Sequence, residues 1–504
     1  MDLGPFDCGV ASGLHAPGAA VLWTRFAPGA SSAVDVEWQV AEDPACERIV
    51  AQGTAAATPD ADGCVKVLVE GLTAGATYWY RFVVDSLVSP VGRTRTPHDG
   101  RIGSNASIGS NGGVGSSVRL AVASCQSYTA GFYPAWRAIA EADLDGVIFL
   151  GDYIYESGGL GPTGVRADGR TADDLASYRA KYRLYRSDAD LRAAHAAHAF
   201  APIWDDHELV NDCSRATLVE DPDRARAAYR AWWEYQPVWP IEGDRIHRRL
   251  RWGDLVDLTL LDTRQYRDPA IEDGWGNGIK FGATLDPPLR GVHSPERSLL
   301  GAAQRDWLLE GLGQAEQDGV TWKLIGNQVM ISPIRLLDLD EPALRALRPD
   351  LPEHAGVYAN FDDWSGFMAE RDLVTEHLRG ERISHVGFLT GDIHSFWQSD
   401  VLGDFDEPDS PVVAQEFVCG SISSPGLELL GAAAESVEAT LRGLRPGFRY
   451  VDLQRRGYGL VECTPSAASV EFRTVDALYT RSDERRSARF DWPLGDDRVR
   501  FSRP

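Results

Sequence analysis

The sequence predicts an α/β fold in which an all-β region precedes a larger region of alternating strands and helices. Residues 1–98 contain short runs of β-branched and aromatic residues, as in a β-sandwich domain. Residues 99–118 are rich in glycine and serine, which indicates a linker. From residue 119 onward strands alternate with helical patterns, and 504 residues are enough for more than one domain. We therefore expect a β domain at 1–98, a linker at 99–118 and an α/β domain at 119–504.

The first region reads as a small sandwich. Its expected strands are residues 20–25, 34–40, 64–69 and 78–84, which are separated by clusters of glycine, proline and aspartate. Residues 72–78 resemble the tyrosine turn of fibronectin-type modules. No dense group of polar residues occurs here, so we interpret this region as a scaffold or a lid.

The second region is organised around residues 144–156. Residues 147–150 form an apolar run that ends in glycine and aspartate, which predicts a buried central strand. A strand at 120–125 and a helix at 132–142 precede it, and this β-α-β order implies a parallel pair. Further strands are expected at 200–204, 256–261, 322–325, 385–390, 416–424 and 469–475, and further helices at 171–199, 302–312 and 367–378.

The composition of the chain argues against some kinds of binding partner. The formal net charge of −24 argues against duplex nucleic acid as the main partner, although bound cations would still allow an anionic substrate. No apolar run is long enough to cross a membrane. Seven widely spaced cysteines do not form a disulfide framework. No export signal is recognisable, so we expect a cytoplasmic protein, or a secreted or periplasmic one whose signal was removed.

Polar donor groups follow five of the expected strands. They would meet at one edge if these strands share a sheet, because parallel strands of an α/β sheet place ligands at their carboxyl ends. Each donor also has a plain structural interpretation, such as a capping aspartate, a packing tyrosine or a small buried cysteine. The donors are Cys125, Asp152 with Tyr155, Asp206 with His207, Asn327, and Asp392 with His394.

The donors are of two chemical kinds, which predicts an asymmetric pair of metal ions. Cys125, Tyr155 and His394 favour a transition metal, and a phenolate favours Fe(III) in particular. Asp206 and Asp392, together with an amide from Asn211 or Asn327, favour a hard divalent ion such as Ca²⁺, Mg²⁺ or Mn²⁺. One aspartate could bridge both ions, as two-metal hydrolases require.

The ordered motifs resemble the calcineurin-like metallophosphoesterases, and more closely the PhoD family of alkaline phosphatases and phosphodiesterases. The likeness extends from about residue 6 to about residue 475. It rests on the sequences at 6–13, 21–25, 123–126, 151–155, 204–208, 261–266, 326–328, 391–394 and 421–424. The resemblance implies a fibronectin-like or immunoglobulin-like β domain followed by a metallophosphoesterase β-sandwich flanked by helices.

The resemblance also implies roles for residues. It implies Fe(III) held by Cys125, Asp152, Tyr155 and His394. A divalent ion, expected to be calcium, would share Asp152 and use Asp206 and Asp392, with Asn211 as a further candidate. His207 matches a histidine that assists the leaving group, and Asp205 or Glu208 would steady it. We also expect Asn327 to support the ligands and Arg264 to add positive charge to the phosphate.

The expected function is hydrolysis of small phosphate esters, of which nucleotides and phospholipids are two candidates. A phospholipase D-like phosphodiesterase on the same fold is one alternative. The other is a metal-binding β protein without catalysis. The sequence leaves the natural substrate and the oligomeric state open.

Overall fold

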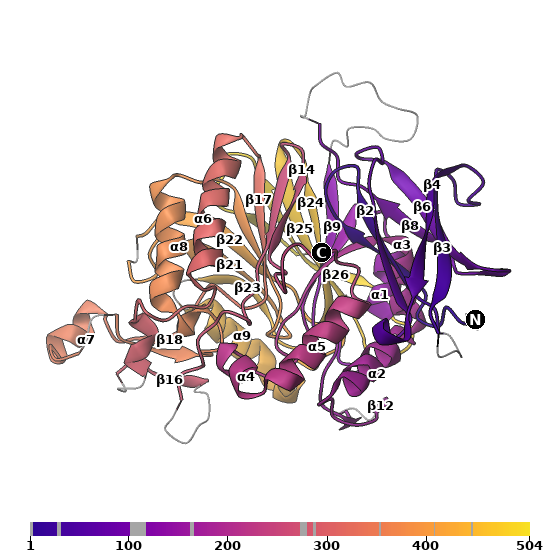
Figure 1. Ribbon diagram of the computed structural model, residues 1–504. Coiled ribbons are helices and arrows are strands. Elements are labelled where there is room, and N and C mark those ends of the chain that lie inside the picture. The colour runs from indigo at the N-terminus through magenta and orange to yellow at the C-terminus, as the bar shows by residue number, and fades with distance from the viewer. Residues whose placement is uncertain are drawn as a thin grey trace.

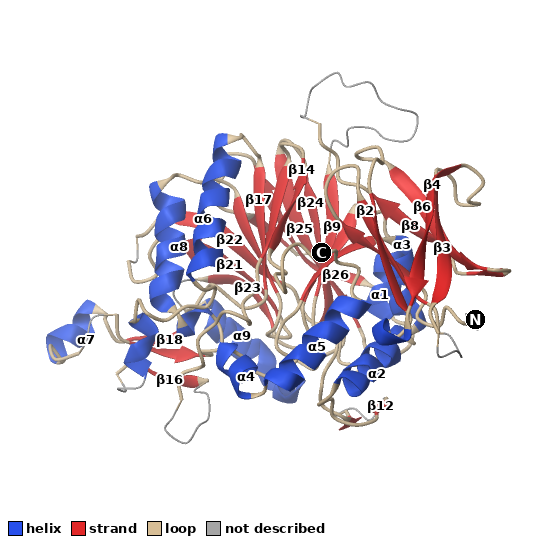
Figure 2. Cartoon of the chain, in the orientation of Figure 1, coloured by secondary structure: helices blue, strands red, loops and turns tan. Residues whose placement is uncertain are grey.

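The computed structural model describes most of the chain as a mixed α/β protein (Figures 1 and 2). The described residues are 4–27, 32–100, 117–161, 166–272, 280–285, 289–351, 354–407, 409–444 and 447–503.

Ten strands of the described chain form the larger sheet. Its centre is parallel: β9 pairs with β10, β10 with β13, and β13 with β1. The remaining pairs are antiparallel. In spatial order the strands are β27 (Arg500–Ser502), β26 (Arg485–Pro493), β25 (Ala467–Val475), β24 (Arg456–Cys463), β9 (Val118–Ala123), β10 (Gly146–Leu150), β13 (Ala199–Ile203), β1 (Val10–Leu14), β2 (Ala20–Arg25) and β5 (Cys64–Val69).

A second, seven-stranded sheet also has a parallel centre, in which β15, β17, β20 and β22 are neighbours. Its order is β14 (Arg248–Trp252), β15 (Val256–Leu260), β17 (Trp322–Asn327), β20 (Val386–Thr390), β22 (Val412–Val418), β21 (Phe396–Leu402) and β23 (Phe448–Asp452). Most residues of its central strands are buried, as expected for a sheet that is covered on both faces.

The two sheets pack face to face. A Cβ built on Gly326 of β17 would lie 3.2 Å from Leu150 Cδ2 of β10, so glycine allows the close approach of the layers there. The rings of Phe396 and Phe472 are 5.0 Å apart across the interface. One buried cluster combines side chains of both sheets. The predicted β-sandwich is confirmed.

Helices cover the outer faces of the sandwich (Figure 2). Leu308 of α6 and Val374 of α8 belong to the same buried cluster as Phe388 of β20. On the other sheet, the Trp136 ring of α1 lies 5.8 Å from that of Phe149. The helices are α1 (Pro134–Glu141), α2 (Leu175–Arg186), α3 (Ala189–Ala197), α4 (Arg215–Glu220), α5 (Pro222–Tyr235), α6 (Ala302–Gln317), α7 (Pro342–Leu347), α8 (Met368–Gly380) and α9 (Ala434–Arg442).

The N-terminal region adds a further β layer. Its separate sheet packs on β2 and β5 through a buried apolar cluster. The tyrosine turn is present, because the Thr73 N–H donates to Tyr78 Oη at 2.9 Å. The sheet consists of β4 (Ile49–Ala57), β3 (Val34–Ala41), β6 (Thr77–Val84), β7 (Leu87–Val88) and β8 (Gly92–Arg95).

This region is continuous with the large sheet, because β1 pairs with β13 through Ser12–Ala199 and Gly13–Phe200. The division of the chain into domains at residue 98 remains a prediction, and this boundary does not coincide with a break in the sheet. Most of the predicted linker, residues 101–116, lies outside the described residues.

Two expected elements differ from the structure. The single helix expected over 171–199 is two helices, because Asp188 caps the start of α3 by accepting from the N–H groups of Asp190 and Leu191. The strand expected over 416–424 ends at Val418 with β22, and residues 421–424 form a loop. Within the described residues no helix is long and apolar enough to span a membrane.

Several further short elements belong to the described chain, and three of them, β12, β16 and β18, are labelled in the lower part of Figure 1. They are β11 (Gly159–Leu160), β12 (Ala167–Asp168), β16 (Phe281–Ala283), β18 (Ile334–Asp338) and β19 (Gly356–Ala359), together with the 3-10 helices η3 (Trp364–Gly366) and η4 (Glu428–Ala433).

Candidate metal centre

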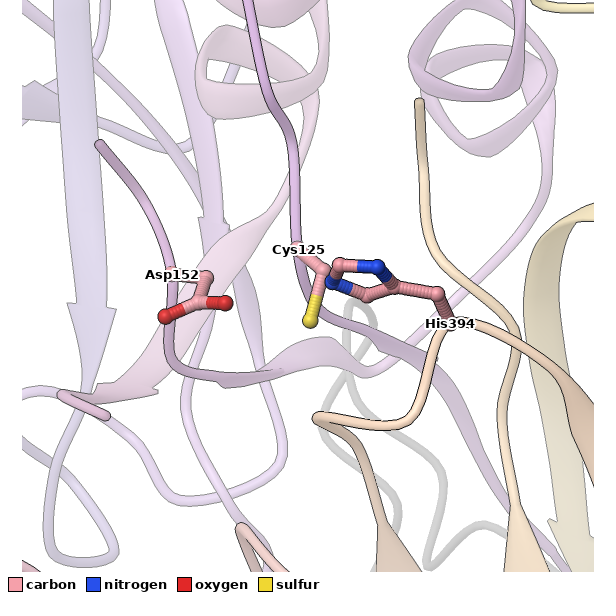
Figure 3. A group of neighbouring side chains, drawn as sticks. All are labelled: Cys125, Asp152 and His394. Carbon is pink, nitrogen blue, oxygen red and sulfur yellow. The ribbon is translucent and has the colours of Figure 1, made fainter. Parts of the chain in front are cut away.

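The carboxyl ends of β9, β10, β13 and β20 meet between the two sheets. Cys125, Asp152 and Asp392 each lie two residues beyond a strand end, and Asp206 lies three residues beyond β13. Figure 3 shows Cys125, Asp152 and His394 around one point, brought there from three separate segments of the chain. The donors therefore converge as the sequence predicted, but the single shared sheet expected for their strands is wrong: β9, β10 and β13 belong to the larger sheet and β20 to the second one.

Four of these donors have a left-handed backbone, which is uncommon outside glycine. The φ angles are 57° at Cys125, 59° at Asp152, 62° at Asp392 and 55° at His394. Hydrogen bonds between loops hold the first two in place, since the Cys125 N–H donates to Gly151 O at 3.1 Å. Strained residues that gather at one point are typical of a functional site.

Cys125, Asp152, His394 and Tyr155 form one side of the centre. The ligand atoms of Cys125, Asp152 and His394 lie within 4.8 Å of one another. Tyr155 Oη lies 3.0 Å from Asp152 Oδ2 and 3.1 Å from His394 Nε2. His394 Nδ1 is 2.9 Å from Pro425 O, which leaves Nε2 as the nitrogen available to a metal.

Burial determines the protonation of these donors. It raises the pKa of both the Cys125 thiol and the Tyr155 phenol well above their ordinary values. It lowers the pKa of His394 to about 4, so this imidazole is neutral and able to bind a metal at neutral pH. A thiolate and a phenolate would need a strong positive charge here to form. The set therefore fits a highly charged ion such as Fe(III).

Asp206 is the centre of the second side. Its carboxylate belongs to three groups whose ligand atoms lie within 4.8 Å of one another, which fits a hard cation with oxygen ligands. Burial raises the pKa of Asp392 to about 7, so binding of a cation at this carboxyl is coupled to loss of a proton. The groups are Asp152 with Asp206 and His207, Asp205 with Asp206 and Asp392, and Asp206 with Asp212 and Asp362.

Arg264 lies beneath the carboxylates with its side chain fully buried. Its guanidinium bonds to Asp205 and lies 3.0 Å from Asp362, and 3.8 Å from both Asp206 and Asp392. The expected contact between Arg264 and a phosphate has no geometric support, because the side chain has no exposed surface. Its guanidinium instead hydrogen-bonds Asp205 and Asp362 and offsets part of the repulsion among all four carboxylates.

His207 lies at the open side, with 17% of its side chain exposed. Its Nδ1 is 2.7 Å from Glu156 Oε2, and its ring lies 4.2 Å from the ring of Tyr155. Burial lowers the pKa of His207, but the charges of Asp206 and Asp152 outweigh it and raise the value well above normal. Before a cation binds at Asp152 and Asp206, these charges favour the protonated imidazole, which is the form that can act as an acid.

The residues expected to steady His207 have other partners. Glu208 accepts from the backbone N–H groups of Asp152 at 3.0 Å, Tyr153 at 2.7 Å and Asp205 at 2.9 Å, so it holds two ligand loops together. Asp205 is paired with Arg264. The interpretation that either one orients His207 is corrected by the direct Glu156 contact.

The two candidate amides differ in position. Asn211 is exposed, and its backbone N–H donates to Glu156 at 3.3 Å. Asn327 is buried, and its amide bonds to Val329 O and to Trp364 Nε1. Asn327 thus supports the loop after β17, and a ligand role for Asn211 remains a prediction.

Sequence reasoning missed Glu156, Ser424, Asp212, Asp362 and Lys280. Glu156 directly follows the Gly-Asp-x-x-Tyr motif, so its spacing from Asp152 was a usable signal. Ser424, whose Oγ lies 2.6 Å from Tyr155 Oη, belongs to a motif already noted. Asp362 follows a short strand far from the recognised motifs, and nothing in its local sequence marks it.

The chain is similar in sequence to a known family of phosphatases. Residues 120–472 match the family described as PhoD-like phosphatase, and residues 2–98 match its N-terminal domain. Alkaline phosphatase D of Bacillus subtilis (strain 168) is 31% identical over 494 residues, which cover 94% of this chain and 78% of that protein.

Solved structures show the same fold. A structure of PhoD has a TM-score of 0.85 and 29% identity, and the match covers 100% of this chain and 93% of that one. The purple acid phosphatase PPD1 from yellow lupin has a TM-score of 0.52 and 9% identity, over 92% of this chain and 71% of that one. The second likeness concerns the fold alone.

Proposed function

This chain belongs to the PhoD-like phosphatase family, and we propose that it hydrolyses phosphate esters at a two-metal centre that shares Asp152. Membership makes it a metal-dependent phosphoric ester hydrolase. One observation carries the two-metal proposal: Asp152 is grouped both with Cys125 and His394 and with Asp206 and His207. A carboxylate within reach of two donor groups can bridge two ions.

We assign Fe(III) to Cys125, Asp152, Tyr155 and His394. The support is chemical, because a thiolate, a phenolate and an imidazole together suit a transition metal of high charge. The hydrogen bond from His394 Nδ1 to Pro425 O orients the ring for this role.

We assign a divalent ion, calcium before magnesium or manganese, to Asp152, Asp206 and Asp392, with Asn211 as a further candidate. Asp362 joins this set because its carboxylate is grouped with that of Asp206. Calcium suits an irregular set of several oxygen donors, whereas magnesium demands near-octahedral geometry. When bound, the two ions activate water and offset the negative charge of the phosphoryl oxygens.

His207 would protonate the leaving oxygen of the ester. The Glu156 carboxylate at Nδ1 raises the pKa of the His207 imidazole, which favours a proton on the ring and leaves Nε2 as the nitrogen that can donate. The side chain is partly exposed, as a group that meets the substrate must be. Glu208 contributes by holding the loops of Asp152 and Asp205.

Small phosphate esters are the proposed substrates, with monoesters preferred and diesters accepted. Nothing in the comparisons favours the phospholipase D-like alternative. A histidine with its own carboxylate partner beside the donor groups argues against a purely structural metal site, which would be closed.

A substrate panel combined with metal analysis tests this function. Purified protein should contain iron and a divalent ion, and should hydrolyse p-nitrophenyl phosphate and bis-p-nitrophenyl phosphate but not phosphatidylcholine. Rapid hydrolysis of phosphatidylcholine would favour the phospholipase alternative. Full activity in protein that contains zinc alone would refute the metal assignment.

A further inference from the structure

Lys280 lies at the exposed side of the acidic group formed by Asp206, Asp212 and Asp362. Its Nζ is 2.7 Å from Asp212 Oδ1 and 3.7 Å from Asp362 Oδ2, and 49% of its side chain is exposed. Asp362 thus has Arg264 on the buried side of the centre and Lys280 on the solvent side.

The four lysines of the chain, all within the described residues, differ in how they are used. Lys66, Lys181 and Lys323 each donate to a backbone carbonyl, of Trp233, Ser157 and Ser384 respectively. Two of them, Lys181 and Lys323, are buried. Lys280 differs because the partners of its ammonium, Asp212 and Asp362, are carboxylates and its side chain remains half exposed, so it can turn toward a ligand.

The position of the Lys280 backbone is set by the strand that follows it. This residue directly precedes β16, whose Phe281 pairs with Ala359 of β19, and Lys280 O accepts from the Asn360 N–H at 2.5 Å. Asp362 follows β19 by three residues. One small sheet therefore positions both the cation and the carboxylate beside it, and Lys280 is not an incidental surface charge.

A half-exposed ammonium beside the metal centre suits the negative charge of the substrate's phosphoryl group. A phosphomonoester carries close to two negative charges at neutral pH because its second pKa is about 6, whereas a diester carries one. Lysine offers a compact charge with three donors on a flexible stem. Arg264 cannot make this contact because its side chain is fully buried.

Resting on the proposed function, we propose that Lys280 binds the terminal phosphoryl oxygens of the substrate and makes the site selective for monoesters over diesters. The ammonium leaves Asp212 and Asp362 to meet the doubly charged phosphoryl group. A diester replaces one of these oxygens with a second ester group, so it gains less from the same cation.

The test compares Lys280→Met and Lys280→Arg with wild type. For p-nitrophenyl phosphate, kcat/KM of Lys280→Met should fall about tenfold or more, the scale of a lost hydrogen bond between charged groups. For bis-p-nitrophenyl phosphate the loss should be smaller than about threefold, since that ester carries half the charge. Lys280→Arg should restore much of the ratio. The control is Arg226→Met, which removes an exposed cation paired with Asp223 on α5 and should change neither rate.

Two further readouts separate binding from structure. Equilibrium binding of orthophosphate to the metal-loaded Lys280→Met protein, measured by calorimetry, should weaken by a factor similar to the monoester loss. Metal content should match wild type. An unchanged ratio of the two esters would overturn the proposal, as would a loss of metal with both rates falling together. Wild-type protein that hydrolyses neither ester would instead refute the proposed function.

Discussion

The two sides of the metal centre are stabilised in opposite ways. On the thiolate side, formed by Cys125, Tyr155 and His394, the supporting contacts are neutral groups such as Pro425 O and Ser424 Oγ. On the carboxylate side, formed by Asp206, Asp212, Asp362 and Asp392, the supporting groups are charged, with Arg264 buried among them.

The difference shows how one site can select two ions. The thiol and the phenol are neutral without a metal. They therefore select an ion of high charge, because only such an ion lowers their pKa values enough for them to lose their protons. Carboxyl donors lose their protons more readily than a thiol or a phenol and are partly balanced by arginine, so they suit a divalent ion of lower charge. Asp152 belongs to both sides, so its substitution should affect both ions, whereas the other substitutions should act on one side each.

The largest expected effect comes from Asp152→Asn. Loss of the shared carboxylate should reduce both iron and divalent ion content and lower kcat/KM by more than about a hundredfold, since even supporting residues of metal sites cost 10–100-fold. Elemental analysis and p-nitrophenyl phosphate assays measure this. Loss of one ion alone would show that Asp152 serves a single side.

Arg264→Met should act on the carboxylate side. It leaves four carboxylates without their buried cation and should lower the free energy of unfolding by about 3–5 kcal/mol. Denaturant titration measures this, with Arg226→Met as the surface control. Added calcium should recover part of the loss, because it neutralises the same carboxylates. If the variant were as stable as wild type, the proposed role of Arg264 in positioning the carboxylates would be wrong.

Glu156→Gln tests the acid assigned to His207. Without the carboxylate at Nδ1 the pKa of His207 should fall, and kcat should drop about tenfold, within the range for lost partners of catalytic groups. The drop should be larger for phenyl phosphate than for p-nitrophenyl phosphate, whose leaving group needs less protonation. Equal losses on both esters would point to a structural effect.

The smallest effect concerns pH and stability without metal. The pKa of Asp392 is raised to about 7 in the folded protein, above its value in the unfolded chain, because burial disfavours the charged form. This carboxyl makes the folded protein bind more protons between about pH 4 and 7, so its contribution to stability is greatest below this range and is lost as pH rises through it. Buried histidines such as His394, whose pKa is lowered to about 4, contribute the opposite slope, so the measurement compares wild type with Asp392→Asn. Without metal, the Tm of wild type relative to Asp392→Asn should fall by several degrees between pH 4 and 7, and a relative Tm that rises over this range would contradict the assignment.

The sequence predicted those residues of the metal centre that directly follow a strand. Cys125, Asp152, Asp206 and Asp392 were found because each follows a short apolar run. Parallel pairing brings the ends of β9, β10 and β13 together, whereas the end of β20 reaches them only through the packing of the two sheets, which the sequence did not predict. Glu156 was missed because its role depends on its contact with the His207 imidazole, which comes from a different loop. Asp362 and Lys280 were missed because a three-stranded sheet of short strands, β16, β19 and β18, carries them to the centre.

For the fold, too, the sequence predicted local elements but not contacts between distant segments. Strands β2 and β5 have the bounds that the sequence predicted, because alternation and turn residues are local signals. The pairing of β1 with β13 depends on residues nearly two hundred positions apart, and no local pattern specifies it. The continuity of the N-terminal region with the large sheet could therefore be learned only from the structure.

The most direct test of two unlike metal sites is the visible spectrum. A thiolate and a phenolate on Fe(III) should make the protein purple to brown, and Tyr155→Phe should shift or bleach the band while calcium content stays unchanged. Cys125→Ala should weaken iron binding. Cys463→Ala, at the opposite end of the same sheet beside Val118, should leave colour and iron as in wild type. A colourless wild-type protein, or a band that Tyr155→Phe does not alter, would contradict the assignment of iron to this side.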